Sequence, residues 1–275
     1  MIYFDECDAI VNGTGILATQ ASLSISNSLT PIKTIGKRGA LTQSAQSDLT
    51  ANLQLNYFLE TDNEPNYELV QEIKNFFLKD EIYSPKQLVI GGISGEYYLN
   101  SYSIQAKPNQ IITAAASYLN FGGVSGSFAK KNSSIAYNKS NGNNIGAFVF
   151  ITEAGNYLEN KTLSFEYNFA CTWQPINVIG QRKQVEVKLL SAEEKITVEK
   201  EKFSNLSFSG DKASLTLFNS DEAGTIKIYG FKFACSKDTS FGKEISLSGF
   251  RINQSEVGVA VDGFLTNKIS FNKYY

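Results

Sequence analysis

The chain contains the stretch Pro31-Ile32-Lys33-Thr34-Ile35-Gly36-Lys37-Arg38-Gly39-Ala40 and repeats it as Pro175-Ile176-Asn177-Val178-Ile179-Gly180-Gln181-Arg182-Lys183-Gln184. The proline, both isoleucines, the glycine and the arginine recur at the same places, 175 − 31 = 144 positions apart in a chain of 275 residues. A repeat separated by a little over half the chain length is typical of a duplicated domain.

Three further pairs of segments occur in the same order around these two connectors. Their offsets are 163 − 23 = 140, 247 − 99 = 148 and 259 − 113 = 146 residues. The pairs are Leu23-Ser24-Ile25 with Leu163-Ser164-Phe165, Leu99–Tyr102 with Leu247–Phe250, and Thr113–Leu119 with Val259–Leu265. We therefore predict two tandem homologous domains, residues 1–126 and 145–275, joined by a small and polar linker at 127–144.

Both predicted domains are mainly β, because apolar and polar residues alternate with a period of two. In the first copy this pattern predicts half-buried strands near 17–25 and 49–57, followed by strands at 87–90, 96–105 and 111–121. The fold class expected is a pair of β-sandwich or barrel domains.

Residues 62–80 have a different pattern, with Pro65 suited to a first helical turn and apolar residues spaced for one helix face. We expect one amphipathic helix packed on the sheet of the first copy. The charge-rich run 191–202 is interpreted as a solvated edge or protruding hairpin, with a contact to another copy as the alternative.

The composition argues against the common catalytic chemistries. The chain has no histidine, which excludes Ser-His and Cys-His nucleophiles within one chain, and its three cysteines lack zinc-like spacing. The segment Gly91–Gly95 lacks the spacing of a nucleophile elbow, and Gly36–Gly39 lacks that of a phosphate-binding loop. We expect a protein that is not an enzyme, with no catalytic residue, cofactor or metal.

Charge and hydropathy also limit the partners. The formal net charge is −2, so no bulk basic field exists to hold nucleic acid. No apolar run reaches the roughly 18 residues of a membrane span, and the first residues do not resemble a secretory signal. We expect neither a membrane partner nor secretion.

The end of the first copy resembles a known family. A serine-rich strand (98–105), a turn with Pro108-Asn109 and a small-residue strand ending in Tyr118 follow one another. This unit resembles the closing hairpin of tail tube proteins from long-tailed, siphovirus-like bacteriophages. The resemblance implies β domains of two sheets flanked by a helix, which close into six-domain rings that stack around a channel for DNA.

A duplicated tube domain implies that three chains supply one pseudo-hexameric ring. The partners expected from the resemblance are other copies of the chain, other tail proteins and DNA that passes non-specifically. The expected location is the virion tail, after assembly in the host cytoplasm. The candidate assembly contacts are in the repeated connectors, with ordinary surface loops as the alternative: Gly36, Lys37, Arg38, Gly180 and Arg182.

Two alternatives remain at this point. A baseplate hub or distal tail protein, forming one ring at the tube end, has the same sequence features. A carbohydrate-binding β-sandwich belongs to another class and is favoured by the many Tyr and Asn residues. The lack of a secretory signal and of an aromatic cluster on one short loop weighs against it.

Overall fold

The computed structural model describes most of residues 9–128 and 148–275. Within these ranges the description omits 17, 28, 37, 40–41, 46–48, 60–63, 80–81, 108–109, 154–155, 158–161, 180–183, 201–205, 210–211, 216–224, 227–228, 235–242, 247–249 and 260–264. The described chain is mainly β with one α-helix, which confirms the prediction of a mainly β chain; its strands form one large antiparallel sheet and smaller flanking sheets. Most of the predicted linker at 127–144 lies outside the described residues.

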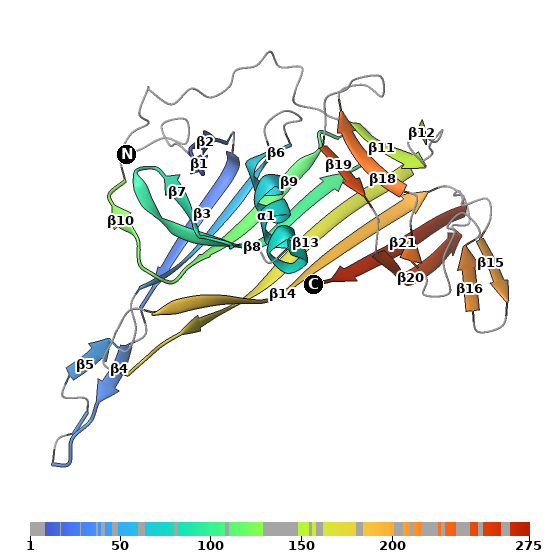
Figure 1. Ribbon diagram of the computed structural model, residues 1–275. Coiled ribbons are helices and arrows are strands. Elements are labelled where there is room, and N and C mark those ends of the chain that lie inside the picture. The colour runs from blue at the N-terminus through green and yellow to red at the C-terminus, as the bar shows by residue number, and fades with distance from the viewer. Residues whose placement is uncertain are drawn as a thin grey trace.

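A long antiparallel sheet runs through the molecule and contains strands from both ends of the sequence (Figure 1). Its first four strands, in spatial order, are β3 (Ala18–Ser26), β6 (Thr50–Phe58), β9 (Thr113–Asn120) and β8 (Ile93–Ala106). The sheet continues with β13 (Thr162–Ile176), β14 (Glu186–Lys200), β21 (Leu265–Tyr274), β20 (Phe250–Val259) and the short β17 (Thr225–Ile226).

Smaller sheets flank this main sheet. The first part of β8 also pairs with β7 (Lys86–Ile90), which leads to β1 (Ala9–Val11) and β2 (Thr14–Gly15). A separate four-stranded sheet has the order β12 (Asn156–Tyr157), β11 (Phe148–Glu153), β18 (Tyr229–Ala234) and β19 (Lys243–Ser246). The remaining strands are β4 (Leu29–Ile32), β5 (Thr42–Ala45), β10 (Ser125–Gly126), β15 (Leu206–Ser209) and β16 (Lys212–Leu215).

The strand order is the same in the two halves of the chain. The main sheet reads β3-β6-β9-β8 and then β13-β14-β21-β20, so the first strand, the second, the last and the third follow one another in each half. The flanking strands read β2-β1-β7-β8 in the first half and β12-β11-β18-β19 in the second. The two halves join where β8 pairs with β13.

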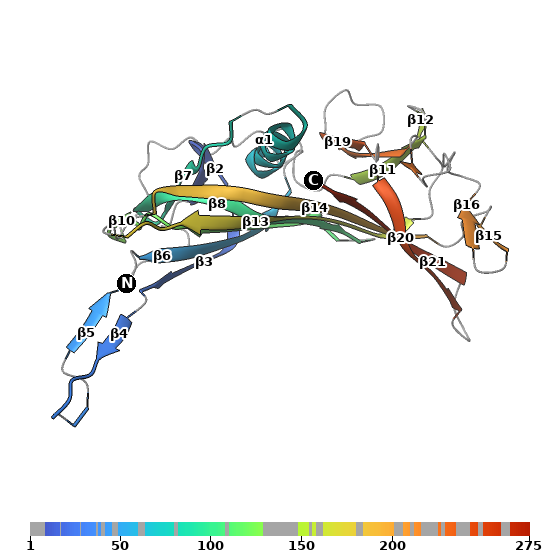
Figure 2. The same ribbon diagram turned by 60° about the horizontal axis from the view of Figure 1, so that its bottom comes forward.

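The main sheet is an arch, and α1 (Pro65–Lys79) lies on its convex side (Figure 2). The helix lies on this side because the apolar side chains of the sheet face it, as strand β6 illustrates. In β6, buried residues alternate with exposed polar ones: Ala51, Leu53, Leu55 and Tyr57 are buried, whereas Asn52, Gln54 and Asn56 are exposed. The buried side of the sheet and the apolar face of α1 form one core, whose largest fully buried side chains include Tyr102, Tyr118, Tyr167, Phe165 and Phe169.

The helix confirms the prediction for residues 62–80. It begins at Pro65, has Glu68 in its first turn and Lys79 in its last, and buries Leu69, Val70 and Ile73. These charges oppose the helix dipole at both ends, and the buried residues share one face.

Polar groups at the start of α1 attach it to the sheet. The Tyr57 hydroxyl donates to a carboxylate oxygen of Glu64 at 2.5 Å, and the Asn66 amide nitrogen donates to the Tyr57 oxygen at 2.6 Å. Tyr118 completes the chain by donating to the Asn66 carbonyl. Because all four side chains are buried, these bonds fix the entry of the helix over β6 and β9.

Two of the sequence interpretations are wrong. The charge-rich run 191–202 is not a solvated edge, because its described part is the C-terminal part of β14, which pairs with β13 on one side and, from Glu193 on, with β21 on the other. The equivalence of Thr113–Leu119 with Val259–Leu265 also fails: the first segment is a strand, whereas the second runs from the last residue of β20 to the first of β21. Small apolar residues occur in both, and this coincidence produced the match.

Cys171 of β13 offers a test of how tightly the second half is packed. Its side chain is buried and free, and burial raises the pKa of its thiol well above the usual value. The thiolate therefore forms only at a pH far above neutrality, and few reagents reach it. In the Cys7→Ser/Cys235→Ser variant, we expect iodoacetamide at mildly alkaline pH to modify Cys171 at least about tenfold more slowly in the folded protein than in urea. Equal rates in the two states would contradict this packing.

Candidate functional site

The first candidate surface is the free edge of β3, at one end of the main sheet. Strand β3 pairs with β6 on one side, and no described strand pairs with its other side. Its sequence, ATQASLSIS, has neither a charge nor a proline, which are the features that normally protect an exposed strand edge. About every second residue of this nine-residue strand thus directs its backbone donor and acceptor outward, where no described strand pairs with them.

The side chains of β3 correct the prediction that this strand is half-buried. Ala21, Leu23 and Ile25 lie in register with the buried Leu55, Leu53 and Ala51 of β6, on the core side of the sheet. Nevertheless Ala21 is exposed, Leu23 is only partly buried and Ile25 is 44% exposed. The apolar face that the sequence predicts exists, but the described chain covers it only in part: Leu23 packs against the core, whereas Ala21 and Ile25 stay exposed.

The opposite end of the main sheet has an edge that is also open. Strand β20 pairs with β21 along its length, whereas its outer neighbour β17 covers only Phe250 and Arg251. Within the described residues, the outer side of 252–259 has no strand partner. The two open edges come from strands at opposite ends of one continuous sheet.

The repeated connectors form the tips of two projecting hairpins. The first hairpin, which we call the first arm, consists of β4 and β5 and extends away from the body (Figure 1). Its tip contains Gly36 and Gly39, whose φ angles of 88° and 89° favour glycine. The second arm is the outer part of the β13–β14 hairpin, which continues past β8 and β21 to the Val185–Ile176 backbone bond.

The two arms place matching residues in matching positions. Pro31 and Ile32 are paired residues near the end of the first arm, and Pro175 and Ile176 hold the same place in the second. Farther out, Ile35 and Ile179, which are 179 − 35 = 144 positions apart, are both fully exposed. An isoleucine that contacts nothing in its own chain is available to a partner.

The predicted assembly residues have the following positions. Gly36 and Arg38 lie exposed at the tip of the first arm, so the predicted extended connector is the turn of a hairpin. Lys37, Gly180 and Arg182 lie outside the described residues. The described parts of both repeated connectors lie at the same end of the sheet (Figure 2).

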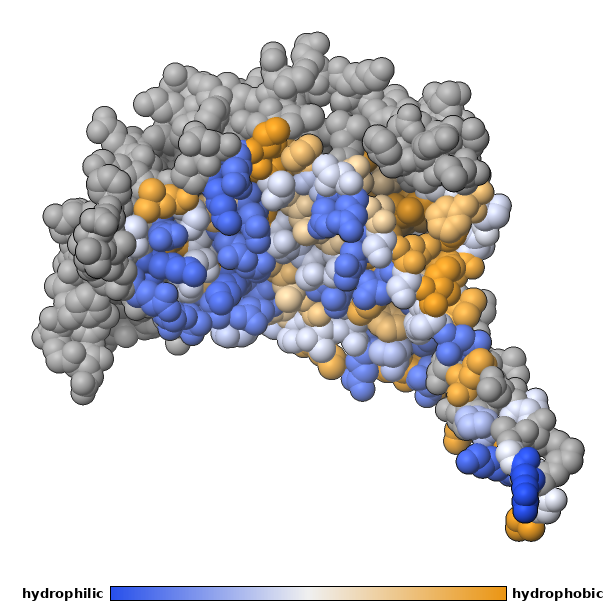
Figure 3. Space-filling view, turned by 180° about the vertical axis from the view of Figure 1, so that it is seen from behind, coloured by the Kyte–Doolittle hydropathy of each residue, from blue (hydrophilic) through white to orange (hydrophobic). Residues whose placement is uncertain are grey.

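The concave face of the arch is polar from one half to the other. In one row, Asn56, Ala115, Ser103, Asn168, Lys195 and Asn272 stand beside one another on six successive strands. Among the described side chains of this face, the charged ones are Glu166, Glu193, Glu199 and Glu256 against Lys195 and Lys268. Figure 3 shows this side, with hydrophilic residues across its middle and hydrophobic ones toward the edge that carries the first arm.

A buried carboxylate on the opposite side holds the helix to the second half of the chain. Glu194 of β14 is 0% exposed and accepts hydrogen bonds from Lys74 of α1 at 2.9 Å, Tyr167 at 2.7 Å and Tyr275 at 2.7 Å. Burial, and then the negative charge of Glu194, raise the pKa of both tyrosines, so the phenols stay protonated as donors. The cluster therefore connects α1 to β13, β14 and the end of β21.

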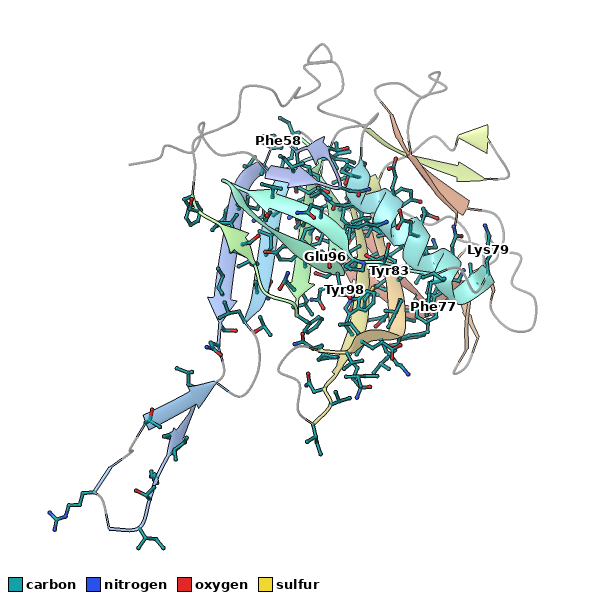
Figure 4. All side chains as sticks on the ribbon, turned by 60° about the vertical axis from the view of Figure 1, so that its left-hand side comes forward. Phe58, Phe77, Lys79, Tyr83, Glu96 and Tyr98 are labelled. Atoms are coloured by element: carbon teal, nitrogen blue, oxygen red, sulfur yellow. The ribbon has the colours of Figure 1, made fainter. Side chains whose placement is uncertain are left out.

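An aromatic cluster lies where the two halves meet, beside the base of the second arm. Trp173 lies 4.9 Å from Tyr98 and 5.3 Å from Tyr83 between ring centroids, and Phe121 lies 5.9 Å from Tyr98. Trp173 also donates its indole N–H to the Leu99 carbonyl at 2.8 Å. Figure 4 shows Tyr83 and Tyr98 between the sheet and the end of α1 that carries Phe77 and Lys79.

Sequence reasoning missed this cluster because four separate segments contribute to it: the α1–β7 loop, β8, the residues after β9, and β13. No short loop contains them. Two adjoining cavities of about 520 Å³ each border the cluster and share Glu186 and Val187.

The described residues form neither a metal-ligand cluster nor a membrane-spanning helix. Among the described residues, no cluster of three or more acidic, histidine or cysteine side chains is placed to ligate a metal. Across that part of the chain, no helix has the length and apolarity needed to span a membrane. Comparison with protein-family models and with curated proteins gives no match.

Proposed function

We propose that the chain is a structural subunit of a hollow homo-oligomer, of the kind found in the tail tubes of long-tailed bacteriophages. The observation that carries the proposal is the pair of open strand edges at the two ends of one arched sheet. A sheet with an unprotected edge at each end binds copies of itself head to tail, and its curvature turns such a chain of subunits into a ring.

The contact between the two halves provides the template for the contact between chains. Inside one chain, β8 and β13 join through six residue pairs, from Phe165 with Ala106 to Ala170 with Ser101. By strand order, β20 holds the place of β8 and β3 holds the place of β13. A β20–β3 seam between chains therefore repeats a contact that the chain already makes internally.

The repeated strand order also supports two tandem copies of a tail-tube-like domain, with the boundary near 127–144. Three chains then give six domains and a pseudo-hexameric ring. In the first half α1 follows β6, whereas the described residues that follow β14 in the second half form the short strands β15 and β16. A divergence of this kind is expected when each copy keeps only the surfaces that it uses.

The polarity of the two faces of the arch supports a proposal for which face lines the lumen. We infer that the concave face lines the lumen, because it is hydrated and carries four glutamates against two lysines among its described charges. Each lysine or arginine on a DNA phosphate adds a salt-dependent hold. A slightly acidic wall lets DNA pass without binding, as a conduit requires.

The proposal is tested by sedimentation velocity and negative-stain electron microscopy of the purified full chain. Stacked rings with a central channel support the tube subunit, and single rings that do not stack support a hub or distal tail protein instead. A protein that stays monomeric at high concentration contradicts both.

The arms are the surfaces we propose for contacts between stacked rings. Their exposed tips project from the same end of the sheet, and the first carries Ile35 and Arg38. We expect Arg38→Ala/Arg182→Ala to leave the subunit folded, with an unchanged circular dichroism melt, and to shorten or abolish tubes. Tubes of normal length from this variant would count against a role for the arms.

A further inference from the structure

Two neighbouring cavities border the aromatic cluster, and together they are called the groove. One cavity lies between the end of α1 and the second arm, where Phe77, Tyr83 and Trp173 line it. The other lies between the β7–β8 hairpin and the start of β14, where Tyr98 and Phe121 line it. Glu186 and Val187 line both cavities, and the two linings together contain six aromatic side chains: Phe76, Phe77, Tyr83, Trp173, Tyr98 and Phe121.

The second cavity has a polar wall facing its rings. Gln87, Ser94, Glu96 and Asn120 line it together with Tyr98. Asn120 is 1% exposed and donates its amide N–H to the Glu96 carbonyl at 2.8 Å, whereas its own side-chain oxygen is buried without a hydrogen-bond partner. An unsatisfied buried acceptor costs stability unless a ligand supplies a donor.

The charged residues that line the groove limit the class of ligand that it can bind. Among the described residues that line it, the charged ones are Glu96 and Glu186 against Lys188. Single-stranded nucleic acid also stacks on aromatic rings, but it requires a positively charged groove, which this one is not. Carboxylates and an amide oxygen instead accept hydrogen bonds from hydroxyl groups.

We propose that this groove binds a neutral oligosaccharide. The C–H faces of successive sugar rings lie on the aromatic side chains, and their hydroxyl groups donate to Glu96, Glu186 and the Asn120 oxygen. Each cavity has a volume of about 520 Å³, which suits a short oligosaccharide because small-molecule sites occupy about 300–1,000 Å³. This site is independent of ring formation, because all its residues belong to one chain.

Trp173 is the only tryptophan of the chain, so its fluorescence reports directly on this groove. The experiment titrates the full-length protein with maltotriose, cellotriose, chitotriose and β-1,4-galactotriose, and with the trinucleotide dT3 as an anionic stacking ligand. We expect a saturable change of emission with at least one trisaccharide and none with dT3.

Three variants locate the binding. Tyr98→Leu removes a ring from the floor, and Glu96→Ala removes an acceptor at an exposed position of the wall, so each is expected to weaken binding at least about tenfold. Gln54→Ala changes an exposed residue of the concave face and is expected to leave the titration unchanged. The circular dichroism of each variant confirms its fold, and Glu96→Ala serves as the test if Tyr98→Leu does not fold.

Each other outcome overturns the proposal. If no trisaccharide alters the emission, the groove does not bind this class of ligand, and if dT3 alters it instead, the groove binds nucleic acid. If emission changes only with protein concentration, the groove is covered by another copy of the chain. A response that is unchanged in Glu96→Ala and Tyr98→Leu places the saccharide elsewhere.

Discussion

The double variant Ala21→Lys/Ile25→Lys is expected to fold as a stable subunit and to form no tubes or rings. Both positions are exposed on β3, so the substitutions bury no charge and the free energy of unfolding should change by less than about 1 kcal/mol. In a β20–β3 seam, however, six lysines per three-chain ring would lie at the joints between subunits. Lysines on an edge strand prevent strand addition, and those at a joint lose hydration. Sedimentation velocity measures the loss of assembly directly.

The matched control is Gln54→Lys on the neighbouring strand β6. It adds the same side chain at an exposed position, but on the concave face and away from the edge. We expect this variant to assemble like the unmodified chain. Normal assembly of the β3 double variant, or equal loss in both proteins, would show that the β3 edge is not the contact.

Glu194→Ala is expected to give the largest loss of stability of any single substitution considered in this article. The carboxylate is fully buried and receives hydrogen bonds from Lys74, Tyr167 and Tyr275. Its removal leaves a largely buried ammonium group and two buried hydroxyl groups without their acceptor. Breaking a buried ion pair in this way costs about 3–5 kcal/mol, and urea unfolding should show a loss of that size.

Two variants distinguish the effect of the Glu194 charge on stability from the effect of its buried position. Glu193→Ala removes the same side chain one residue earlier, on the concave face, where its described partner is the Asn272 amide at 2.9 Å. We expect a loss of about 1 kcal/mol. Glu194→Gln keeps an acceptor for Lys74 and Tyr167 and should lie between the two. If Glu193→Ala destabilises the protein as much as Glu194→Ala, the buried cluster does not hold α1 to the second half.

The sequence predicts the structure best where the pattern of apolar residues within one strand or helix matches the face that is buried. The alternation along β6 and the one-sided apolar pattern of α1 predict their structures, because local periodicity and core packing agree there. The charge-rich strand β14 shows the opposite case. Its buried Glu194 has partners from α1, β13 and the last residue of the chain, and only the tertiary structure brings these together.

The candidate sites also combine features that a local sequence pattern indicates with features that only the tertiary structure creates. The repeat of Pro, Ile, Gly and Arg predicts two equivalent connectors, but it could not indicate that the described parts of both lie at the outer ends of projecting hairpins. The period-two pattern of β3 indicated an apolar face, but not that this face stays partly uncovered within the described chain. The aromatic groove has no signal in the sequence, because its rings come from distant segments.

The most direct test of the account is a cryo-electron microscopy reconstruction of the assembled protein at a resolution that traces individual strands. The account predicts rings of three chains in which β20 of one chain lies beside β3 of the next, with Asn56, Asn168 and Asn272 facing the channel. A reconstruction in which β3 is free, or in which the helix-bearing convex face lines the channel, would contradict it.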